Sequence, residues 1–362
     1  MNPHVTASMR MHYPLNKVEL WWRDHQEWIE SCGYLLRPRY RVGWERPTNR
    51  EETMRSTSWV MDATRLADGV VVALKLISLD DLTVSGEERI MLLLNSEPLA
   101  SHPDNPCPKL YDILTVPGDD NQKLLVLPFL RRFDSPPFET VGEVMDFCRQ
   151  ALHGLRFLHE HDIAHRDPHY MNIMLDPTSM YPNGFYTGHP SYDCYAADLS
   201  IRAQVFTRTQ RPSRYYWIDY GLADVFRSDR ADLRVPYVRG GDKDIPETRK
   251  GLTRADPFAA DVWWVGNLIQ TQLLERYSGL ESLAPLVASM CRESPEDRPT
   301  MVAATVHFDK ILMQCSSWRL RSLTVRRKHL LARFLQGLPP YILHTVSYLL
   351  TRKPALPSAR SV

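Results

Sequence analysis

The chain has 362 residues, of which 43% are hydrophobic, so it can bury a sizeable core. Its 44 basic and 43 acidic residues nearly balance, which excludes the positive excess typical of proteins that bind nucleic acid. The six cysteines form no C-x-x-C pair, and no apolar stretch is long enough for a signal peptide or a membrane span. We therefore expect a soluble cytoplasmic or nuclear protein without zinc and with no nucleic-acid partner.

The first third of the chain predicts a small antiparallel sheet. Residues 1–30 are interpreted as an N-terminal extension whose tryptophans pack on another element. Residues 87–94 predict a helix with Ile90, Met91 and Leu94 on one face. Strands are expected in five short β-type runs: 34–36, 58–61, 70–77, 109–114 and 123–130.

Longer helices are predicted in the rest of the chain. Residues 131–137 are interpreted as a linker, and residues 141–161 have apolar positions with a period near 3.6. Further helices are expected at 261–277 and 282–291. Strands followed by helices predict an α+β fold, with a small antiparallel β-rich part and a larger helical part.

His165-Arg166-Asp167, with Asn172 at the fifth position after the aspartate, is the strongest motif. It resembles the catalytic loop of protein kinases, where the carboxylate receives the proton of an acceptor hydroxyl and the amide oxygen holds a cation. The alternative is a helix-to-loop junction with polar surface residues. Downstream, the apolar run at 215–218 ends in Asp219-Tyr220-Gly221, which resembles the kinase magnesium motif and is otherwise a common turn.

Val72-Ala73-Leu74-Lys75 resembles the kinase strand whose lysine pairs with the α- and β-phosphates. A lysine in an apolar strand needs a partner, and Glu87 is the one we expect. The alternative is that Lys75 extends to solvent from an edge strand.

Three later features extend the resemblance: Pro246-Glu247, Arg298 as its partner, and Asp261 as support for the catalytic-loop backbone. The ordered motifs, over roughly residues 35–305, resemble the eukaryotic protein kinase superfamily. The string 36–40 and the layout are most similar to the fungal-type protein-kinase-like family.

The resemblance implies a bilobal protein-kinase-like fold with a β-rich N-lobe and a larger α-helical C-lobe. Its implied parts are an N-terminal extension (1–30), an N-lobe (31–130), a C-lobe (131–310) with an insertion at about 177–213, and a basic C-terminal tail (311–362).

The resemblance also implies the cofactors ATP and Mg²⁺, a protein substrate, and roles for individual residues. The catalytic set is Asp167, Lys75, Glu87, Arg166 and His169. The nucleotide-binding set is Lys75, Gly43, Leu127, Asn172 and Asp219, of which Asn172 and Asp219 hold the metal.

The chain departs from the kinase pattern in several places. Between residues 41 and 57 only Gly43 can provide the close backbone approach of a phosphate-covering loop. His169 replaces the lysine usual in serine/threonine kinases, and we expect it to donate a hydrogen bond to the γ-phosphate. Residues 177–213 are interpreted as a surface loop. Ser228 and Tyr237 are candidate phosphorylation sites near Arg166.

The tail from residue 318 to 362 contains nine Lys or Arg residues and no Asp or Glu. It resembles a basic amphipathic segment that contacts an anionic membrane or an acidic partner. The alternative is a tail packed against the helical part. Pro339-Pro340 is expected to divide it into two short helices.

The leading functional prediction is an ATP- and Mg²⁺-dependent protein kinase acting on Ser/Thr hydroxyls, with Tyr less favoured. A pseudokinase that serves as a nucleotide-binding or scaffolding module is the alternative, favoured by the missing glycines and by His169. A small-molecule kinase on a related fold is the third reading.

Overall fold

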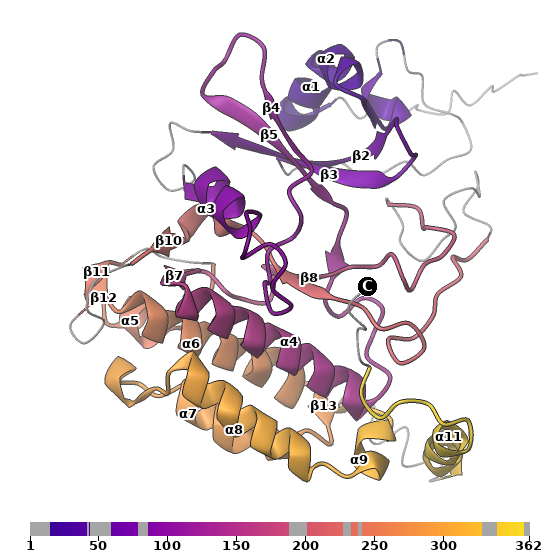
Figure 1. The fold of residues 1–362 in the computed structure, drawn as a ribbon, viewed down its shortest axis with the longest axis vertical. Coiled ribbons are helices and arrows are strands. Elements are labelled where there is room, and N and C mark those ends of the chain that lie inside the picture. Colours follow the sequence, from indigo (N-terminus) through magenta and orange to yellow (C-terminus); the bar gives the residue numbers. More distant parts are fainter. Residues whose placement is uncertain are drawn as a thin grey trace, which may run out of the picture.

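An antiparallel sheet and a larger group of helices lie at opposite ends of the structure (Figure 1). This computed structural model describes most of the chain: residues 15–41, 43, 59–78, 86–187, 201–226, 233–237, 241–327 and 339–357. Within these residues the fold is α+β, as predicted.

The main sheet has five strands in the order β1-β2-β3-β5-β4, with every neighbouring pair antiparallel. The strands are β1 Tyr34–Leu36, β2 Val60–Arg65, β3 Val71–Ser78, β4 Asp112–Thr115 and β5 Gln122–Pro128. A strand lies at or beside each of the five predicted runs, but β2 shares only residues 60 and 61 with the predicted 58–61, and β4 begins three residues later than predicted. Gly69 adopts a φ of 74° in the turn between β2 and β3, a conformation that glycine reaches without strain.

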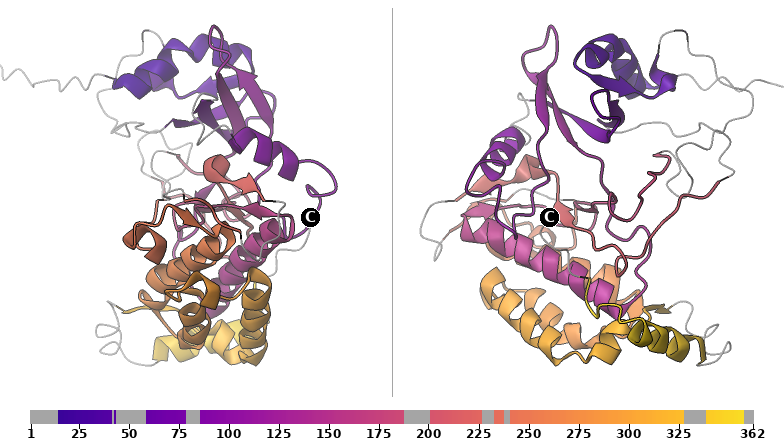
Figure 2. Two further views of the ribbon diagram at one scale, coloured as in Figure 1. Left: turned by 90° about the vertical axis from the view of Figure 1, so that its left-hand side faces the viewer. Right: turned by 45° about the vertical axis from the view of Figure 1, so that its right-hand side comes forward.

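One face of the sheet is covered by the described part of the predicted N-terminal extension, residues 15–30, and by the turn that follows β1. Helices α1 (Lys17–Asp24) and α2 (Gln26–Ser31), with the 3₁₀ turn η1 (Pro38–Tyr40), lie on the side opposite α3 (Figure 2, right). Trp22 and Ile29 are fully buried there with sheet residues such as Val72. Trp22 therefore packs on the sheet, as the sequence suggested.

The other face carries the side chains that matter for the site. Helix α3 (Gly86–Leu94) buries Ile90, Met91 and Leu94, the three positions predicted to share a face. On β3, Lys75 is in register with Leu125, and Ala73 with Leu127. Because registered antiparallel neighbours share a sheet face, Leu127 and Lys75 lie on the same side.

Helix α4 (Val141–Glu160) is the centre of the helical part and matches the predicted helix closely. The helices around it are α5 Pro246–Arg249, α6 Pro257–Leu268, α7 Ala284–Met290, α8 Met301–Gln314, α9 Ser317–Arg321 and α11 Pro339–Leu350. The predicted helix at 261–277 begins earlier, because Asp256 caps it and Pro257 is tolerated in its first turn. It continues into a π-helical turn, Ile269–Leu274.

Short strands and turns connect the helices to the site. β6 (Arg131–Arg132), β8 (Ile173–Leu175) and β9 (Tyr215–Trp217) form a three-stranded sheet, and the remaining strands pair in twos. The pairs are β7 Ile163–Ala164 with β10 Asp224–Val225, β11 Val235–Pro236 with β12 Arg254–Ala255, and β13 Tyr277–Ser278 with β14 Val325–Arg326. Single 3₁₀ turns occur at η2 Tyr220–Leu222, η5 Glu281–Leu283 and η6 Pro295–Asp297.

The described parts of residues 177–213 form no helix or strand and are partly exposed, as a surface loop would be, but several of their side chains are buried in the core. Met180, Tyr181 and Phe185 belong to the main hydrophobic core. Arg208 is only 2% exposed and donates hydrogen bonds to four neutral acceptors: Tyr215 Oη and the carbonyl oxygens of Phe133, Pro136 and Pro137. These bonds offset the cost of burying a guanidinium. Arg208 consequently ties the predicted linker at 131–137 to residues 201–213.

The described parts of the C-terminal tail pack against the helical part, which was the alternative to membrane contact. Leu320 belongs to the main hydrophobic core, Ala355 and Leu356 pack against that core, and Arg327 donates to the carbonyl oxygen of Leu274. Pro339 begins α11, because proline is well suited to the first helical position, and residues 328–338, where the other predicted helix would end, lie outside the described residues. Among the residues described, no helix is both long enough and apolar enough to cross a bilayer.

Candidate active site

A lysine and two carboxylates from three separate elements meet at one point. The ammonium of Lys75, in β3, lies 2.7 Å from Oε1 of Glu87, in α3, and 2.7 Å from Oδ1 of Asp219, which follows β9. The structure thus brings together three of the residues singled out in the sequence. Since β3 is the central strand of its sheet, Lys75 does not extend to solvent from an edge.

Burial and the neighbouring opposite charges shift the pKa values of these three groups in opposite directions. Burial alone would lower the pKa of Lys75, but the carboxylates of Glu87 and Asp219 outweigh it and raise that pKa. Burial raises the pKa of Glu87 against the pull of the ammonium. It also favours a higher pKa for Asp219, yet Lys75 holds that pKa below its usual value. Lys75 is therefore a fixed positive charge beside an ionised, half-exposed Asp219.

Asp167 and Asn172 form a second contact in the loop between β7 and β8. Nδ2 of Asn172 donates to Oδ2 of Asp167 at 2.9 Å and to its main-chain oxygen at 3.0 Å. The main-chain N–H of Gly241 donates to the other carboxylate oxygen, Oδ1, at 2.7 Å. Burial raises the pKa of Asp167, although His169 and the Gly241 N–H oppose this shift. A carboxyl with a raised pKa is a better proton acceptor than an exposed aspartate.

The predicted support of this loop by Asp261 is present. Its buried carboxylate accepts hydrogen bonds from the main-chain N–H groups of His165 and Arg166, at 2.8 and 2.7 Å. Nε2 of His159 lies 2.9 Å from the same carboxylate. Arg166 has a φ of 66°, which is unfavourable for an arginine, so the two bonds hold the loop in a conformation that it would not adopt alone.

Strands β8 and β9 connect the two groups of side chains. The pairing places Ile173 opposite Trp217, and the N–H of Ile218 donates to the main-chain carbonyl oxygen of Asn172 at 2.9 Å. Asn172 therefore lies beside the residue that precedes Asp219. The negative charge of Asp219 contributes to the raised pKa values of both Asp167 and Glu87, which places all these groups in one electrostatic environment.

The side chains of Asn172 and Asp219 suit a hard cation. Because Nδ2 of Asn172 is committed to Asp167, its amide oxygen is the atom left for coordination. Half of the Asp219 side chain is exposed. Mg²⁺ takes such oxygen ligands and commonly adds phosphate oxygens and waters to only one or two protein groups. Within the described residues, no cluster of three or more His, Cys, Asp or Glu side chains could hold a metal by itself.

Glu247, in α5, and Arg298 form the ion pair predicted from the sequence. The guanidinium nitrogens Nη1 and Nη2 lie 2.7 and 2.9 Å from the two carboxylate oxygens, and both side chains are almost fully buried. Arg298 also donates to the carbonyl oxygens of Arg292 and Ala259. The pair fixes the segment that leads from Gly241 into α5.

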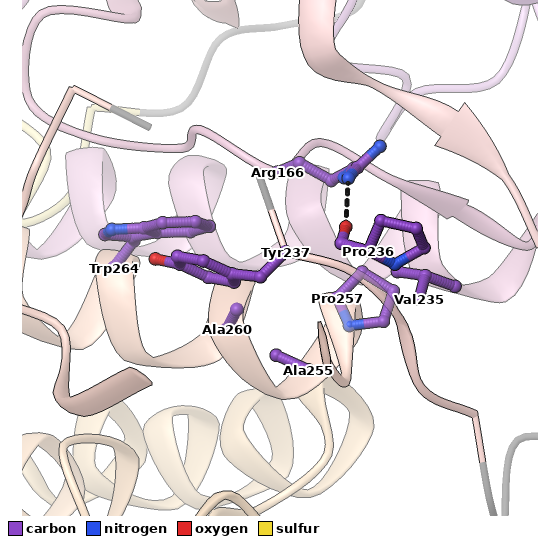
Figure 3. A pocket seen from close by; sticks show the side chains of 8 residues that line it. All are labelled: Arg166, Val235, Pro236, Tyr237, Ala255, Pro257, Ala260 and Trp264. Atoms are coloured by element: carbon purple, nitrogen blue, oxygen red, sulfur yellow. Dashed lines mark hydrogen bonds between the residues drawn. The ribbon is translucent and has the colours of Figure 1, made fainter. Parts of the chain in front are cut away.

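Arg166 lies at the rim of a small apolar hollow (Figure 3). Its guanidinium donates to the carbonyl oxygen of Pro236 at 2.9 Å. Tyr237, a predicted phosphorylation site, lines the same hollow, and its hydroxyl lies 2.7 Å from Oγ1 of Thr248. Tyr237 does lie near Arg166, as expected, whereas Ser228 is outside the described residues.

His169 and Gly43 are the remaining residues of the predicted site. The carboxylate and main-chain oxygens of Asp167 face Nδ1 of His169, and Nε2 of His169 is buried beneath Gly241. The ring of His169 is therefore engaged with Asp167, and its expected contact with a phosphate stays a prediction. Gly43 has a φ of 77°, and the rest of the predicted phosphate-covering loop, 44–57, lies outside the described residues.

Sequence reasoning missed Gly241 and Arg208. Gly240-Gly241 is a pair that could have indicated a close backbone approach. Arg208 is a single arginine in a polar stretch, and nothing in the sequence marks it, because it donates mostly to main-chain oxygens.

Comparison with known proteins supports a relationship to protein kinases. Over 253 residues the chain is 22% identical to a protein of Dictyostelium discoideum described as serine/threonine-protein kinase dst1. The match covers 67% of this chain and 31% of the relative, so the chain corresponds to about a third of that protein's length. No family model matches the chain.

Proposed function

We propose that this chain is an ATP- and Mg²⁺-dependent protein kinase that transfers the γ-phosphoryl group to Ser or Thr hydroxyls and, less favourably, to Tyr. The observation that carries the proposal is the contact of Lys75 with Glu87 and Asp219, next to Asp167 bonded to Asn172. This arrangement has the parts that phosphoryl transfer needs: a fixed cation for phosphates, oxygen ligands for a metal, and a carboxylate for the acceptor.

Each residue has a defined task in the proposed reaction. Lys75, held by Glu87, orients the α- and β-phosphates, and Asp219 with Asn172 holds the cation. Asp167 orients the acceptor hydroxyl and takes its proton as the oxygen bonds to the γ-phosphorus and the bond to the β-phosphate oxygen breaks, which releases ADP. The bound cation neutralises phosphate charge. Most of the acceleration comes from alignment and from charge stabilisation.

The proposal extends to the organisation of the chain. Residues 31–130 form the N-lobe and 131–310 the C-lobe of a bilobal kinase fold, with ATP between them. The sheet backed by α1 and α2, and the helices around α4, support this division. Membership of the fungal-type family remains part of the proposal and rests on the sequence motifs.

A pseudokinase is the second candidate, and one observation favours it. Both carboxylate oxygens of Asp167 already accept hydrogen bonds, from Asn172 and from Gly241. A scaffold with this arrangement binds nucleotide without transferring phosphate.

Transfer of labelled phosphate from Mg-ATP to a generic protein substrate tests the proposal. We expect activity in the wild type and its loss in Asp167→Asn. The matched control is Asp309→Asn, which changes a partly exposed aspartate of α8 and should retain full activity. A wild type that binds Mg-ATP but transfers no phosphate would establish the pseudokinase instead.

A further inference from the structure

The carboxylate of Asp167 is held by a segment far along the chain. Gly241 lies between β11 and α5, and its N–H donates to Oδ1 of Asp167 across 74 sequence positions. The other oxygen, Oδ2, accepts from Asn172. The direction of the carboxylate is thus determined by one donor from its own loop and one from residues 241–245, the Gly241 segment.

His169 faces Asp167 through one ring nitrogen only. Its Nδ1 lies 3.3 Å from the main-chain oxygen of Asp167 and 3.5 Å from Oδ1. Because both atoms are acceptors, Nδ1 carries the proton in the neutral ring. Nε2 is then a lone pair, and it is buried without a hydrogen-bond partner within the described structure.

Gly241 covers that buried nitrogen so closely that a side chain at position 241 would have to displace the His169 ring. A Cβ at position 241 would lie 2.6 Å from Nε2 of His169 and 3.0 Å from Cε1. The backbone dihedral at Gly241 is not in the left-handed region, so an L-residue is excluded here only by the ring. The steric requirement therefore depends on His169 and disappears when the ring is removed.

The Gly241 segment has little freedom to move away from the ring. Nε1 of Trp264 donates to the carbonyl oxygen of Asp242 at 3.0 Å, and Nδ2 of Asn267 donates to the Asp242 carboxylate at 2.6 Å. Both donors belong to α6, which also supports the catalytic loop through Asp261. One helix therefore holds the loop and the segment against each other.

We propose that Gly241 and His169 are a pair of positioning residues for Asp167, in which His169 acts on the carboxylate rather than on phosphate and position 241 must be glycine. The inference rests on the proposed kinase function and adds two residues to it. A side chain at position 241 displaces the N–H from Oδ1 and turns the carboxylate away from the acceptor. Misplacement by about 1 Å can reduce a rate about 100-fold.

Steady-state kinetics of Gly241→Ala, His169→Ala and the double variant test the pair. We expect Gly241→Ala to lower kcat at least tenfold while the KM for ATP and the Mg-ATP-induced shift in melting temperature stay unchanged. His169→Ala should lose several-fold in kcat. The double variant should be faster than Gly241→Ala alone, because removal of the ring makes room for Cβ.

The control is Lys243→Ala, an exposed change in the same segment that should leave kcat unchanged. Wild-type kcat in Gly241→Ala, or a double variant no faster than Gly241→Ala, overturns the inference. If Gly241→Ala does not fold, the double variant still tests the inference, because removal of the His169 ring is expected to restore both folding and activity. A wild type without transfer activity overturns the proposed function, and this inference with it, before any variant is compared.

Discussion

Arg298 offers a quantitative prediction about what holds the Gly241 segment. Arg298→Ala removes both donors of the buried Glu247 carboxylate and the donors of two main-chain oxygens. Loss of one partner from a buried ion pair costs about 3–5 kcal/mol, because the remaining charge has no compensation. An unfolding entropy of about 2.1 cal/mol/K per residue gives about 1.3 °C per kcal/mol for a chain of 362 residues, so the melting temperature should fall by about 4–7 °C.

Helix α5 provides a matched control. Arg249, which lies in α5 as Glu247 does, pairs with Glu293 on the surface, where both side chains are more than half exposed. Arg249→Ala should change the free energy of unfolding by less than about 1 kcal/mol. Calorimetry or denaturant unfolding measures both variants. Equal losses for Arg298→Ala and Arg249→Ala would refute the assignment of a stabilising buried pair.

Three further outcomes are expected. Arg208→Leu should lower the free energy of unfolding by about 2–4 kcal/mol, because it leaves buried carbonyl oxygens without a donor. Denaturant titration measures this loss, and a value below about 0.5 kcal/mol would contradict the expectation. Trp22→Ala should cost about 3–5 kcal/mol by the same measurement, whereas Trp59→Ala, at a 46% exposed side chain, should cost far less. Asp261→Ala should lower kcat at least tenfold with nucleotide binding retained, because the loop that carries Asp167 loses two hydrogen bonds; unchanged kcat would argue against this support.

The sequence predicted elements and contacts whose signals are local. β3 is predicted from an apolar run broken only by Lys75, and α4 from apolar positions with a period near 3.6; their observed bounds differ from the expected ones by one residue. The pairing of Lys75 with Glu87 could also be predicted, because a buried ammonium needs a carboxylate and the next helix supplies one.

What could not be predicted depends on the packing of distant main-chain atoms. Arg208 bonds to carbonyl oxygens more than 70 positions away, and such oxygens have no residue-specific pattern. His169 was expected at a phosphate because its role was taken from the lysine it replaces. Its ring orientation follows instead from the approach of Gly241, which only the folded chain shows.

Thermal melting with and without Mg-ATP determines whether the chain has one Mg-ATP site, formed by Lys75, Glu87, Asp167, Asn172 and Asp219. At 100 times the dissociation constant, bound nucleotide should add about 2.7 kcal/mol of apparent stability to the wild type. Asp219→Ala should abolish that gain, and Asp224→Ala, which alters an exposed carboxylate paired with Arg89, should keep it. A wild type with no shift, or an equal shift in Asp219→Ala, would contradict the claim.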